Sequence, residues 1–297
     1  MSIKRVDLIG VQVDLGASKR GVDMGPAAIR HGGLCEGLTE LEIPWKDQGD
    51  LIPKKEGKSS DKLRNYEQVV GINAELFQAV TESLKQGAFP VVMGGDHSIA
   101  AGSVMAVAQK YKNIGLIWVD AHGDWNDDKS SLSGNMHGMP FSAVCGWGPE
   151  EMVSYVQSPI FVDPKKAVQI GGRDIDYKER ERMKEAGITV FSIADIDKLG
   201  ILEVTNRAME IASKDTEGFH VSYDVDAVTP EAAPGTGTPV HSGLTVREAF
   251  LLIEIIHQSG KMLGLDMVEV NPILDIQNRT GILAAELILA AMGKTVF

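Results

Sequence analysis

The sequence predicts a three-layer α/β fold, with helices on both faces of a mainly parallel β-sheet. Seven short apolar segments are typical of strands, and several are apolar at nearly every position, as strands covered on both faces are. Helical patterns lie between them at crossover spacing, which indicates parallel pairing. We find no internal repeat or second core, and therefore expect residues 1–297 to form a single domain.

The expected strands are short and end in turn or polar residues. They cover residues 6–14, 89–96, 114–124, 167–174, 188–196, 219–226 and 262–272.

Five segments between the strands have helical patterns. They cover residues 66–86, 98–112, 177–186, 245–258 and 279–293. Thr245 and Glu248 form a capping-box motif at the start of the fourth segment. Residues 48–64 are polar and contain glycine and proline, so we expect a surface loop there.

The composition argues against nucleic-acid and membrane partners. The net charge is −12, which opposes binding to a phosphate backbone. No apolar run approaches the ~18–20 residues of a membrane helix, and the first residues lack the apolar core of a signal peptide. Cys35 and Cys145 are far apart and have no metal-binding spacing, as in reduced cytosolic proteins. We therefore expect a soluble, cytoplasmic protein.

Potential metal ligands stand at the ends of four expected strands. Ligands of open parallel sheets bind at the carboxyl ends of the strands, so we expect these side chains to gather at one edge of the sheet. They are His97, Asp120, His122, Asp124, Asp224, Asp226 and Glu269.

The spacing of these residues favours a metal centre. Asp120, His122 and Asp124 stand at i, i+2 and i+4, positions that face the same way in an extended chain, and Asp224 and Asp226 repeat that spacing. Carboxylates buried this close together repel each other, and divalent cations remove that cost. A single such motif is weak, because acidic residues at strand ends often form turns. Three motifs in succession favour metal chemistry.

The ligand types favour Mn²⁺. Carboxylates with imidazole and without thiolate suit Mn²⁺ better than structural Zn²⁺, although Fe²⁺ or Co²⁺ also fits. Two ions that share carboxylates roughly 3.5–4 Å apart can lower the pKa of a shared water, so that hydroxide forms at neutral pH.

The motifs, in this order, resemble the ureohydrolase family of arginases, agmatinases and their relatives. The resemblance covers nearly the whole chain: RGVDMGPAAIR, MGGDHS, DAHGDWN, SGNMHGMP, IGGRDID, SYDVD, PGTGTPV and VEVNP. It implies an eight-stranded parallel sheet between helices, two Mn²⁺ ions per subunit and a homo-oligomer, either a hexamer or a trimer.

The resemblance also implies a ligand set for each ion, with Asp120 and Asp224 bridging. The first ion would be held by His97, Asp120, Asp124 and Asp224, and the second by Asp120, His122, Asp224 and Asp226.

Within the family, the loop SGNMHG at 133–138 resembles that of arginases. This implies hydrolysis of L-arginine to L-ornithine and urea, a reaction of arginine metabolism. The implied substrate-binding residues are Asn126, Ser131 and Ser133 for the α-carboxylate, Asp176 for the α-ammonium, Glu269 for the guanidinium and Thr238 for the pocket wall.

The implied mechanism starts with attack of a metal-bridging hydroxide on the guanidinium carbon. Asp124 takes a proton, and His137 supplies one to the leaving amine, which cannot leave as an anion. Glu269 accepts hydrogen bonds from the guanidinium. The histidines that match none of these positions are expected to be structural or on the surface: His31, His220, His241 and His257.

Trp125, Asp127 and Asp128 depart from the arginase pattern, which has a small aliphatic residue followed by Thr-Pro. The two acids add negative charge beside the loop expected to bind a carboxylate, which would weaken arginine binding or favour a modified substrate. Two alternatives stay open. One is a related enzyme acting on agmatine, guanidinobutyrate or formiminoglutamate, and the other is a non-catalytic arginase-like protein that binds a metabolite or partner.

Overall fold

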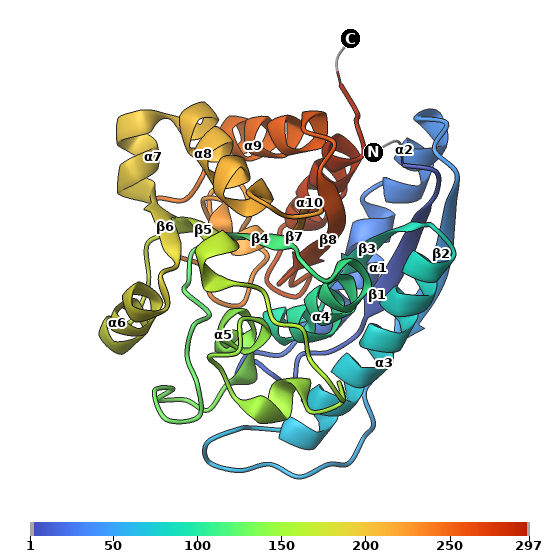
Figure 1. Ribbon diagram of the computed structural model, residues 1–297. Coiled ribbons are helices and arrows are strands. Elements are labelled where there is room, and N and C mark those ends of the chain that lie inside the picture. Colours follow the sequence, from blue (N-terminus) through green and yellow to red (C-terminus); the bar gives the residue numbers. More distant parts are fainter. Residues whose placement is uncertain (1–2, 296–297) are drawn as a thin grey trace.

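Eight strands form one sheet in the order β2-β1-β3-β8-β7-β4-β5-β6, and every pairing between them is parallel (Figure 1). The computed structural model describes residues 3–295. The strands are β1 (Val6–Val11), β2 (Trp45–Leu51), β3 (Phe89–Met93), β4 (Gly115–Val119), β5 (Ala167–Gly172), β6 (Thr189–Ser192), β7 (Phe219–Asp224) and β8 (Met262–Val268).

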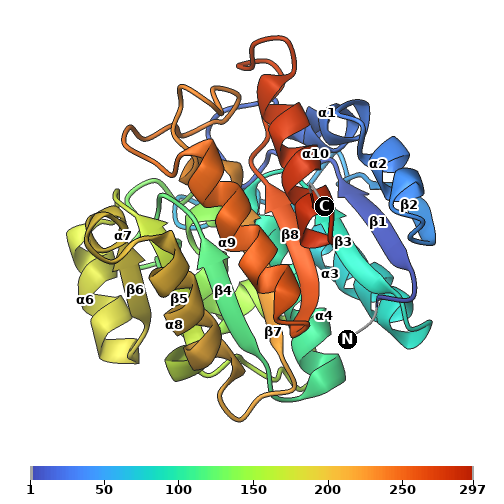
Figure 2. The same cartoon turned by 90° about the horizontal axis from the view of Figure 1, so that it is seen from above.

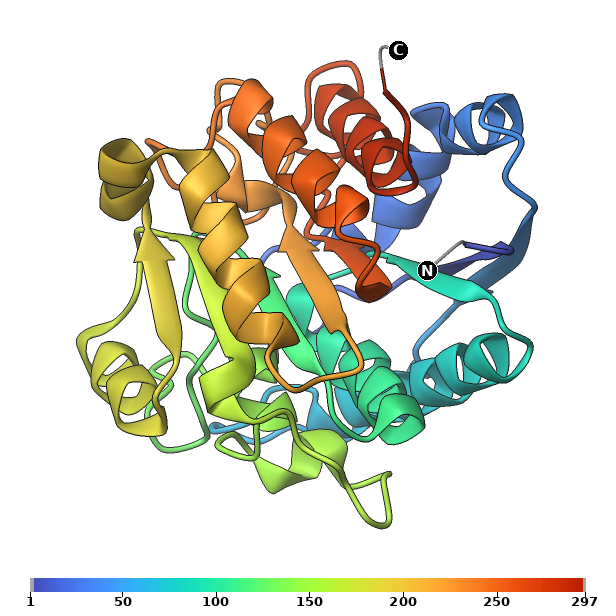
Figure 3. The same ribbon diagram turned by 45° about the horizontal axis from the view of Figure 1, so that its top comes forward.

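Helices cover both faces of this sheet, which gives the expected three layers (Figures 1 and 2). One layer contains α1 (Gly25–His31), α2 (Leu34–Glu40), α7 (Ile193–Leu199), α8 (Ile201–Ser213), α9 (Val246–Gln258) and α10 (Arg279–Ala291). The other contains α3 (Tyr66–Lys85), α4 (Ala100–Tyr111), α5 (Pro140–Val144) and α6 (Tyr177–Ala186). Figure 3 shows the layers obliquely, with α8 to α10 above the sheet and α3 and α4 below it.

The five predicted helices are confirmed as α3, α4, α6, α9 and α10, and Thr245 and Glu248 form the predicted capping box. Five further helices were not predicted, among them α8, whose buried Ile201, Val204 and Ala208 have helical spacing. No helix within residues 3–295 combines the length and apolarity needed to cross a bilayer.

Burial explains why the sequence analysis missed β2, although it found the other edge strand, β6, from its apolar residues. All residues of the six inner strands are buried, whereas the edge strands β2 and β6 are only partly covered. The interpretation of 48–64 as loop is therefore wrong for residues 48–51, which belong to the polar edge strand β2. An edge strand needs no continuous apolar run, so its sequence resembles a loop.

The expected strand ends were too long. The strand expected at 114–124 stops at Val119, and the one expected at 188–196 stops at Ser192. There Ser192 caps α7, because its hydroxyl accepts the Asp195 N–H and the Asp195 carboxylate accepts the Ser192 N–H. Side-chain capping thus ends the strand although the apolar residues continue.

The edge strand β2 is held by Arg30 of α1. Its guanidinium donates to Asp47 at 2.7 and 2.8 Å and to Asp50 at 2.7 Å. Gly10 on the neighbouring β1 leaves room for this cluster, since a Cβ there would collide with the Asp50 carboxylate. The guanidinium of Arg30 therefore attaches the polar edge strand β2 to α1.

We expect Arg30→Met to lower the free energy of unfolding by about 1–2 kcal/mol, because two partly buried carboxylates would lose a shared donor. Urea unfolding measures this. The control is Arg207→Met, which removes an exposed ion pair with Glu203 within α8 and should change stability by less than about 0.5 kcal/mol. Equal losses in the two variants would contradict the anchoring role of Arg30.

Candidate metal centre and adjoining cavity

Four neighbouring inner strands bring the predicted ligands to one edge of the sheet. In the order β3-β8-β7-β4, His97 follows β3, Glu269 follows β8, Asp224 ends β7 and Asp120 follows β4. Parallel pairing places all four carboxyl ends side by side, as expected for a ligand site in an open α/β sheet.

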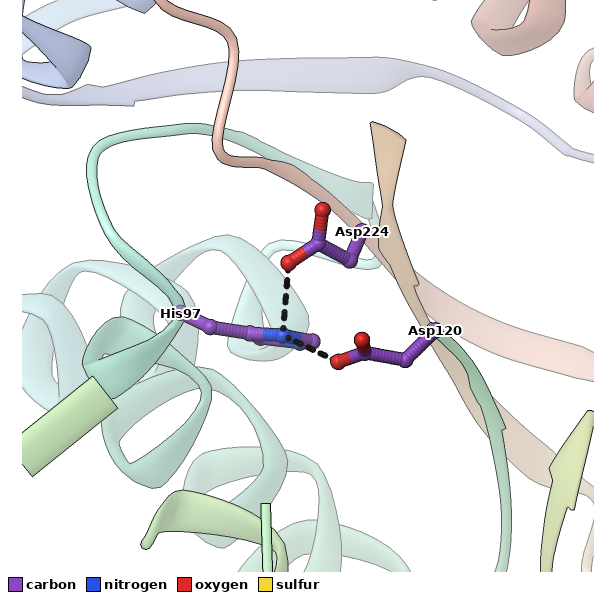
Figure 4. Close-up of side chains that lie close together, drawn as sticks. All are labelled: His97, Asp120 and Asp224. Carbon is purple, nitrogen blue, oxygen red and sulfur yellow. Dashed lines mark ion pairs between the residues drawn. The ribbon is translucent and has the colours of Figure 1, made fainter. Parts of the chain in front are cut away.

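The first ligand group surrounds His97 (Figure 4). The Nδ1 atom of His97 lies 3.0 Å from Asp120 Oδ2, 3.1 Å from Asp124 Oδ2 and 3.4 Å from Asp224 Oδ2. All four side chains are buried. They are the same four residues that the sequence assigned to the first metal.

The second group surrounds His122. Its Nδ1 atom lies 3.1 Å from Asp226 Oδ2 and 3.4 Å from Asp120 Oδ1. Asp120 therefore presents one oxygen to each histidine, which is the arrangement of a bridging carboxylate. Asp224 is grouped with His97 and Asp120, and its contribution to the second ion remains a prediction.

The local backbone is not the extended chain that the spacing implied. Asp124 has φ 47°, in the left-handed region, and Asp226 lies in a short 3-10 turn, where its N–H donates to Asp224 Oδ1 at 2.7 Å. Glu269, with φ 63°, is also left-handed. Non-glycine residues in this region are costly and concentrate at functional sites. The prediction that an extended chain brings these side chains together is therefore wrong beyond Val119. They converge through turns instead.

The pKa shifts of Asp224 and Asp124 reflect burial first and the nearby carboxylates second. Burial, with Asp226 and Asp120 nearby, raises the pKa of Asp224 well above its usual value. Burial and the charge of Asp120 raise the pKa of Asp124 to about 7. A divalent cation would reverse both effects by favouring the ionised carboxylates.

The orphaned nitrogen of His97 tests whether metal ions fit here. The buried His97 Nδ1 has no hydrogen-bond partner, although three carboxylate oxygens surround it at ion-pair distance. Buried polar atoms are rarely left unpaired, and a nitrogen aimed among carboxylate oxygens suits a metal ligand. The donor set of the two groups therefore fits two divalent cations.

His137 and Glu269 form a pair beside the metal ligands. The His137 Nδ1–H donates to Glu269 Oε1 at 3.0 Å, and the same oxygen accepts the His97 N–H at 2.9 Å. Burial alone would lower the pKa of His137, but the hydrogen bond and charge of Glu269 outweigh it and raise that pKa to about 9. Glu269 thus orients a histidine.

A cavity of about 220 Å³ opens beside the ligands. Its walls include His137 and the predicted substrate-binding residues Asn126, Ser133, Asp176 and Thr238. Thr238 also donates to the ligand Asp226, Oγ1 to Oδ2, at 3.3 Å.

The predicted carboxylate-binding residues of the loop differ in their surroundings. Ser131 accepts the Gly134 N–H at 3.0 Å, so its hydroxyl oxygen already serves the loop. Asn126 donates from Nδ2 to Glu179 at 3.1 Å, while its Oδ1 is buried without a partner. The structure thus brings Asn126 and Ser133 to the cavity and ties Ser131 to the turn beneath them.

Comparisons with known proteins agree with this geometry. A sequence model of the arginase family matches residues 4–293. The chain belongs to the arginase family. It is similar to an arginase of Staphylococcus aureus (strain COL), 42% identical over 299 residues that cover 99% of this chain and 98% of that one.

Two solved arginase structures share the fold. The crystal structure of the Bacillus subtilis arginase is 40% identical with a TM-score of 0.95, and the native Bacillus caldovelox arginase is 38% identical with a TM-score of 0.95. Each comparison covers 99% of this chain and 100% of the other.

Glu179 of α6 lines the cavity, although the sequence analysis did not single it out. Its carboxylate accepts the Trp125 N–H at 2.7 Å and the Asp176 N–H at 3.2 Å. It lies in a helix whose residues are mostly charged. The Asp-x-x-Glu spacing from Asp176 to Glu179 is a capping signal that could have marked it.

The departures from the arginase-family pattern are compensated locally. Asp127 pairs with Arg182 at 2.8 Å and accepts two backbone N–H groups of its own loop, and Lys62 lies 3.9 Å from Asp128. Trp125 is buried edge-on against Phe141. Each extra negative charge thus has a positive partner, which reduces its expected effect on a bound carboxylate.

The raised pKa of Glu179 predicts that the stability of the metal-free protein depends on pH. Burial raises its pKa from 4.5 to about 8. A carboxyl group whose pKa is higher in the folded than in the unfolded chain stabilises the fold at low pH. This contribution is lost as the pH rises toward about 8. We expect wild type to lose stability relative to Glu179→Gln between about pH 4.5 and about 8, measured by urea unfolding.

The control is Glu185→Gln, which changes an exposed residue of the same helix and should follow the wild-type curve. Identical curves for Glu179→Gln and wild type would contradict the shift.

Proposed function

We propose that this protein is a manganese-dependent arginase that hydrolyses L-arginine to L-ornithine and urea. The observation that carries the proposal is the pair of ligand groups, sharing Asp120, beside a cavity that His137 lines. Membership of the arginase family and relatives named as arginases support the substrate.

The metal ions would be two Mn²⁺ per chain. His97, Asp120, Asp124 and Asp224 would hold one ion. Asp120, His122, Asp224 and Asp226 would hold the other. When bound, such a pair lowers the pKa of a shared water and supplies a nucleophile at neutral pH.

The charges of the cavity suit a substrate with cationic groups. Asp174, Asp176 and Glu179 line it together with the ligand Asp124. L-Arginine carries a guanidinium and an α-ammonium, and acidic groups attract both. Asp176 is proposed to bind the ammonium. The α-carboxylate would be bound by donors of the loop, Asn126, Ser131 and Ser133, and Thr238 would form part of the pocket wall.

His137 is the proposed proton donor. Because its Nδ1–H is bonded to Glu269, Nε2 is the nitrogen that would give a proton to the leaving amine. Glu269 Oε1 serves His137 and the His97 backbone, which leaves Oε2 to accept from the guanidinium. Asp124 would receive the proton released by the nucleophile.

We further propose that residues 1–297 act as one domain in a cytoplasmic homo-oligomer, a trimer or hexamer. A groove along α8, α9 and α10 would be the contact between subunits. Its lining includes the apolar residues Ile201, Val246, Phe250 and Leu251 and the charged residues Arg247, Glu248, Glu254, Glu286 and Lys294.

The decisive experiment is a substrate panel with metal content measured on the same sample. Mn²⁺-loaded wild type is assayed with L-arginine, agmatine, guanidinobutyrate and formiminoglutamate, by urea release for the three guanidino compounds and by formamide release for formiminoglutamate. We expect hydrolysis of L-arginine to dominate. Asp120→Ala should lose both ions and all turnover, because Asp120 faces both histidines. Asp163→Ala, at an exposed aspartate outside the ligand groups, should keep both.

If the protein binds two ions but hydrolyses L-arginine only at the background rate, L-arginine is rejected as the substrate. Preference for another compound would identify the protein as the related enzyme. Bound ions without turnover of any compound would favour the non-catalytic alternative. An unchanged metal content in Asp120→Ala would reject bridging.

We expect His137→Asn to retain both ions but to lose roughly 10²–10⁴-fold in kcat, the usual contribution of general acid–base catalysis. Steady-state kinetics and elemental analysis test this. His241→Asn replaces a histidine whose side chain is 88% exposed and should leave both values unchanged. Full activity of His137→Asn would remove the proton-donor role.

A further inference from the structure

A line of buried polar side chains runs along β7 into the metal centre. His220, Ser222 and Asp224 alternate along this strand and therefore share one of its faces. Each is at most 3% exposed. Buried polar groups are costly unless they have partners, so the hydrogen bonds of Ser222 identify what this line connects.

The line reaches His97 through Ser222. The Nε2 atom of His97 lies 3.0 Å from Ser222 Oγ, and this hydroxyl donates to Asp266 Oδ2 at 3.1 Å. Ser222 and Asp266 are register partners on β7 and β8. The chain His97–Ser222–Asp266 thus connects a proposed metal ligand to an acid in the centre of the sheet.

Donors gather at one oxygen of Asp266, whereas its Oδ1 has no hydrogen-bond partner. Its Oδ2 also accepts the Ser103 hydroxyl of α4 at 2.8 Å, and His220 Nε2 lies 2.9 Å away. Gly264 makes room for the His220 ring, because a Cβ there would lie 2.8 Å from His220 Nδ1. Asp266 contacts neither a proposed metal ligand nor the cavity, and it has no role in the proposed mechanism.

The direction of these hydrogen bonds follows from Asp266. An ionised carboxylate only accepts, so the single hydroxyl proton of Ser222 points toward Asp266. The Ser222 oxygen is then an acceptor toward His97, and Nε2 must carry the imidazole proton. The lone pair of a neutral His97 therefore lies on Nδ1, the atom that faces Asp120, Asp124 and Asp224.

We infer that Asp266 is a positioning residue that selects the metal-binding tautomer of His97 through Ser222. The inference rests on the proposed metal centre. Groups behind a metal-ligating histidine fix its tautomer and raise its basicity, and their loss typically weakens metal binding roughly 10- to 100-fold.

The test compares Asp266→Asn with Ser103→Ala. An asparagine amide can donate to Ser222, which frees the serine proton to point at His97 Nε2 and shifts the imidazole proton to Nδ1. Ser103→Ala also removes a buried hydrogen bond of Asp266, but leaves the chain to His97 intact. Mn²⁺ titration calorimetry and elemental analysis after dialysis measure binding, and circular dichroism reports folding of both variants.

We expect Asp266→Asn to bind the ion at His97 roughly 10- to 100-fold more weakly and to retain one ion fewer per chain after dialysis. Ser103→Ala should bind Mn²⁺ as wild type does. Unchanged binding in Asp266→Asn, or equal weakening in Ser103→Ala, would overturn the inference, since the latter indicates a general loss of packing.

If Asp266→Asn does not fold, Ser222→Ala breaks the same chain and should also weaken Mn²⁺ binding, and unchanged binding there would count against the inference. A wild type that binds no Mn²⁺ would instead reject the proposed function.

Discussion

Mutual repulsion among buried carboxylates is the constraint on which the rest of this structure depends. Asp120, Asp124, Asp224 and Asp226 lie within two overlapping groups at the carboxyl edge of the sheet, with Glu269 close behind. A folded chain can hold such a cluster only when a large core offsets its cost and cations or donors neutralise its charge. The six buried inner strands supply that core, and the four central ones place the acids.

The ligands are held rigidly by groups that no metal touches. Trp118 stacks on the His97 ring with centroids 4.1 Å apart and donates to Asp120 Oδ2 at 3.0 Å. Gln169, on β5, donates to the backbone carbonyl groups of Asp120 and His122. Together with the chain through Ser222, these contacts hold the side chains of His97 and Asp120 and the backbone of His122. Such a preformed site avoids reorganisation when an ion binds.

Charge compensation differs between the metal centre and the loop at 127–128. Near the metal centre, the described ion pairs of the acidic ligands are with histidines, and Glu269 pairs with His137. In the loop, Asp127 is paired with Arg182, and Lys62 approaches Asp128. Negative charge is therefore concentrated where cationic groups would bind, and it is balanced in the loop proposed to bind a carboxylate.

The sequence by itself determined the α/β class and the inner strands, because buried strands are continuously apolar. Its polar strand ends and its resemblance to a family supplied the proposed ligands. It did not reveal β2. This strand is attached through Arg30, which lies 15 positions before its first residue, Trp45. Nor did it reveal how the ligands converge. Left-handed Asp124 and the 3-10 turn at Asp226 replace the extended spacing, and such turns are set by surrounding contacts. Only the tertiary structure placed Asp266 behind His97. The two residues are 169 positions apart in the sequence, and Ser222 connects them because β7 pairs with β8. No local sequence pattern encodes a hydrogen bond across a sheet.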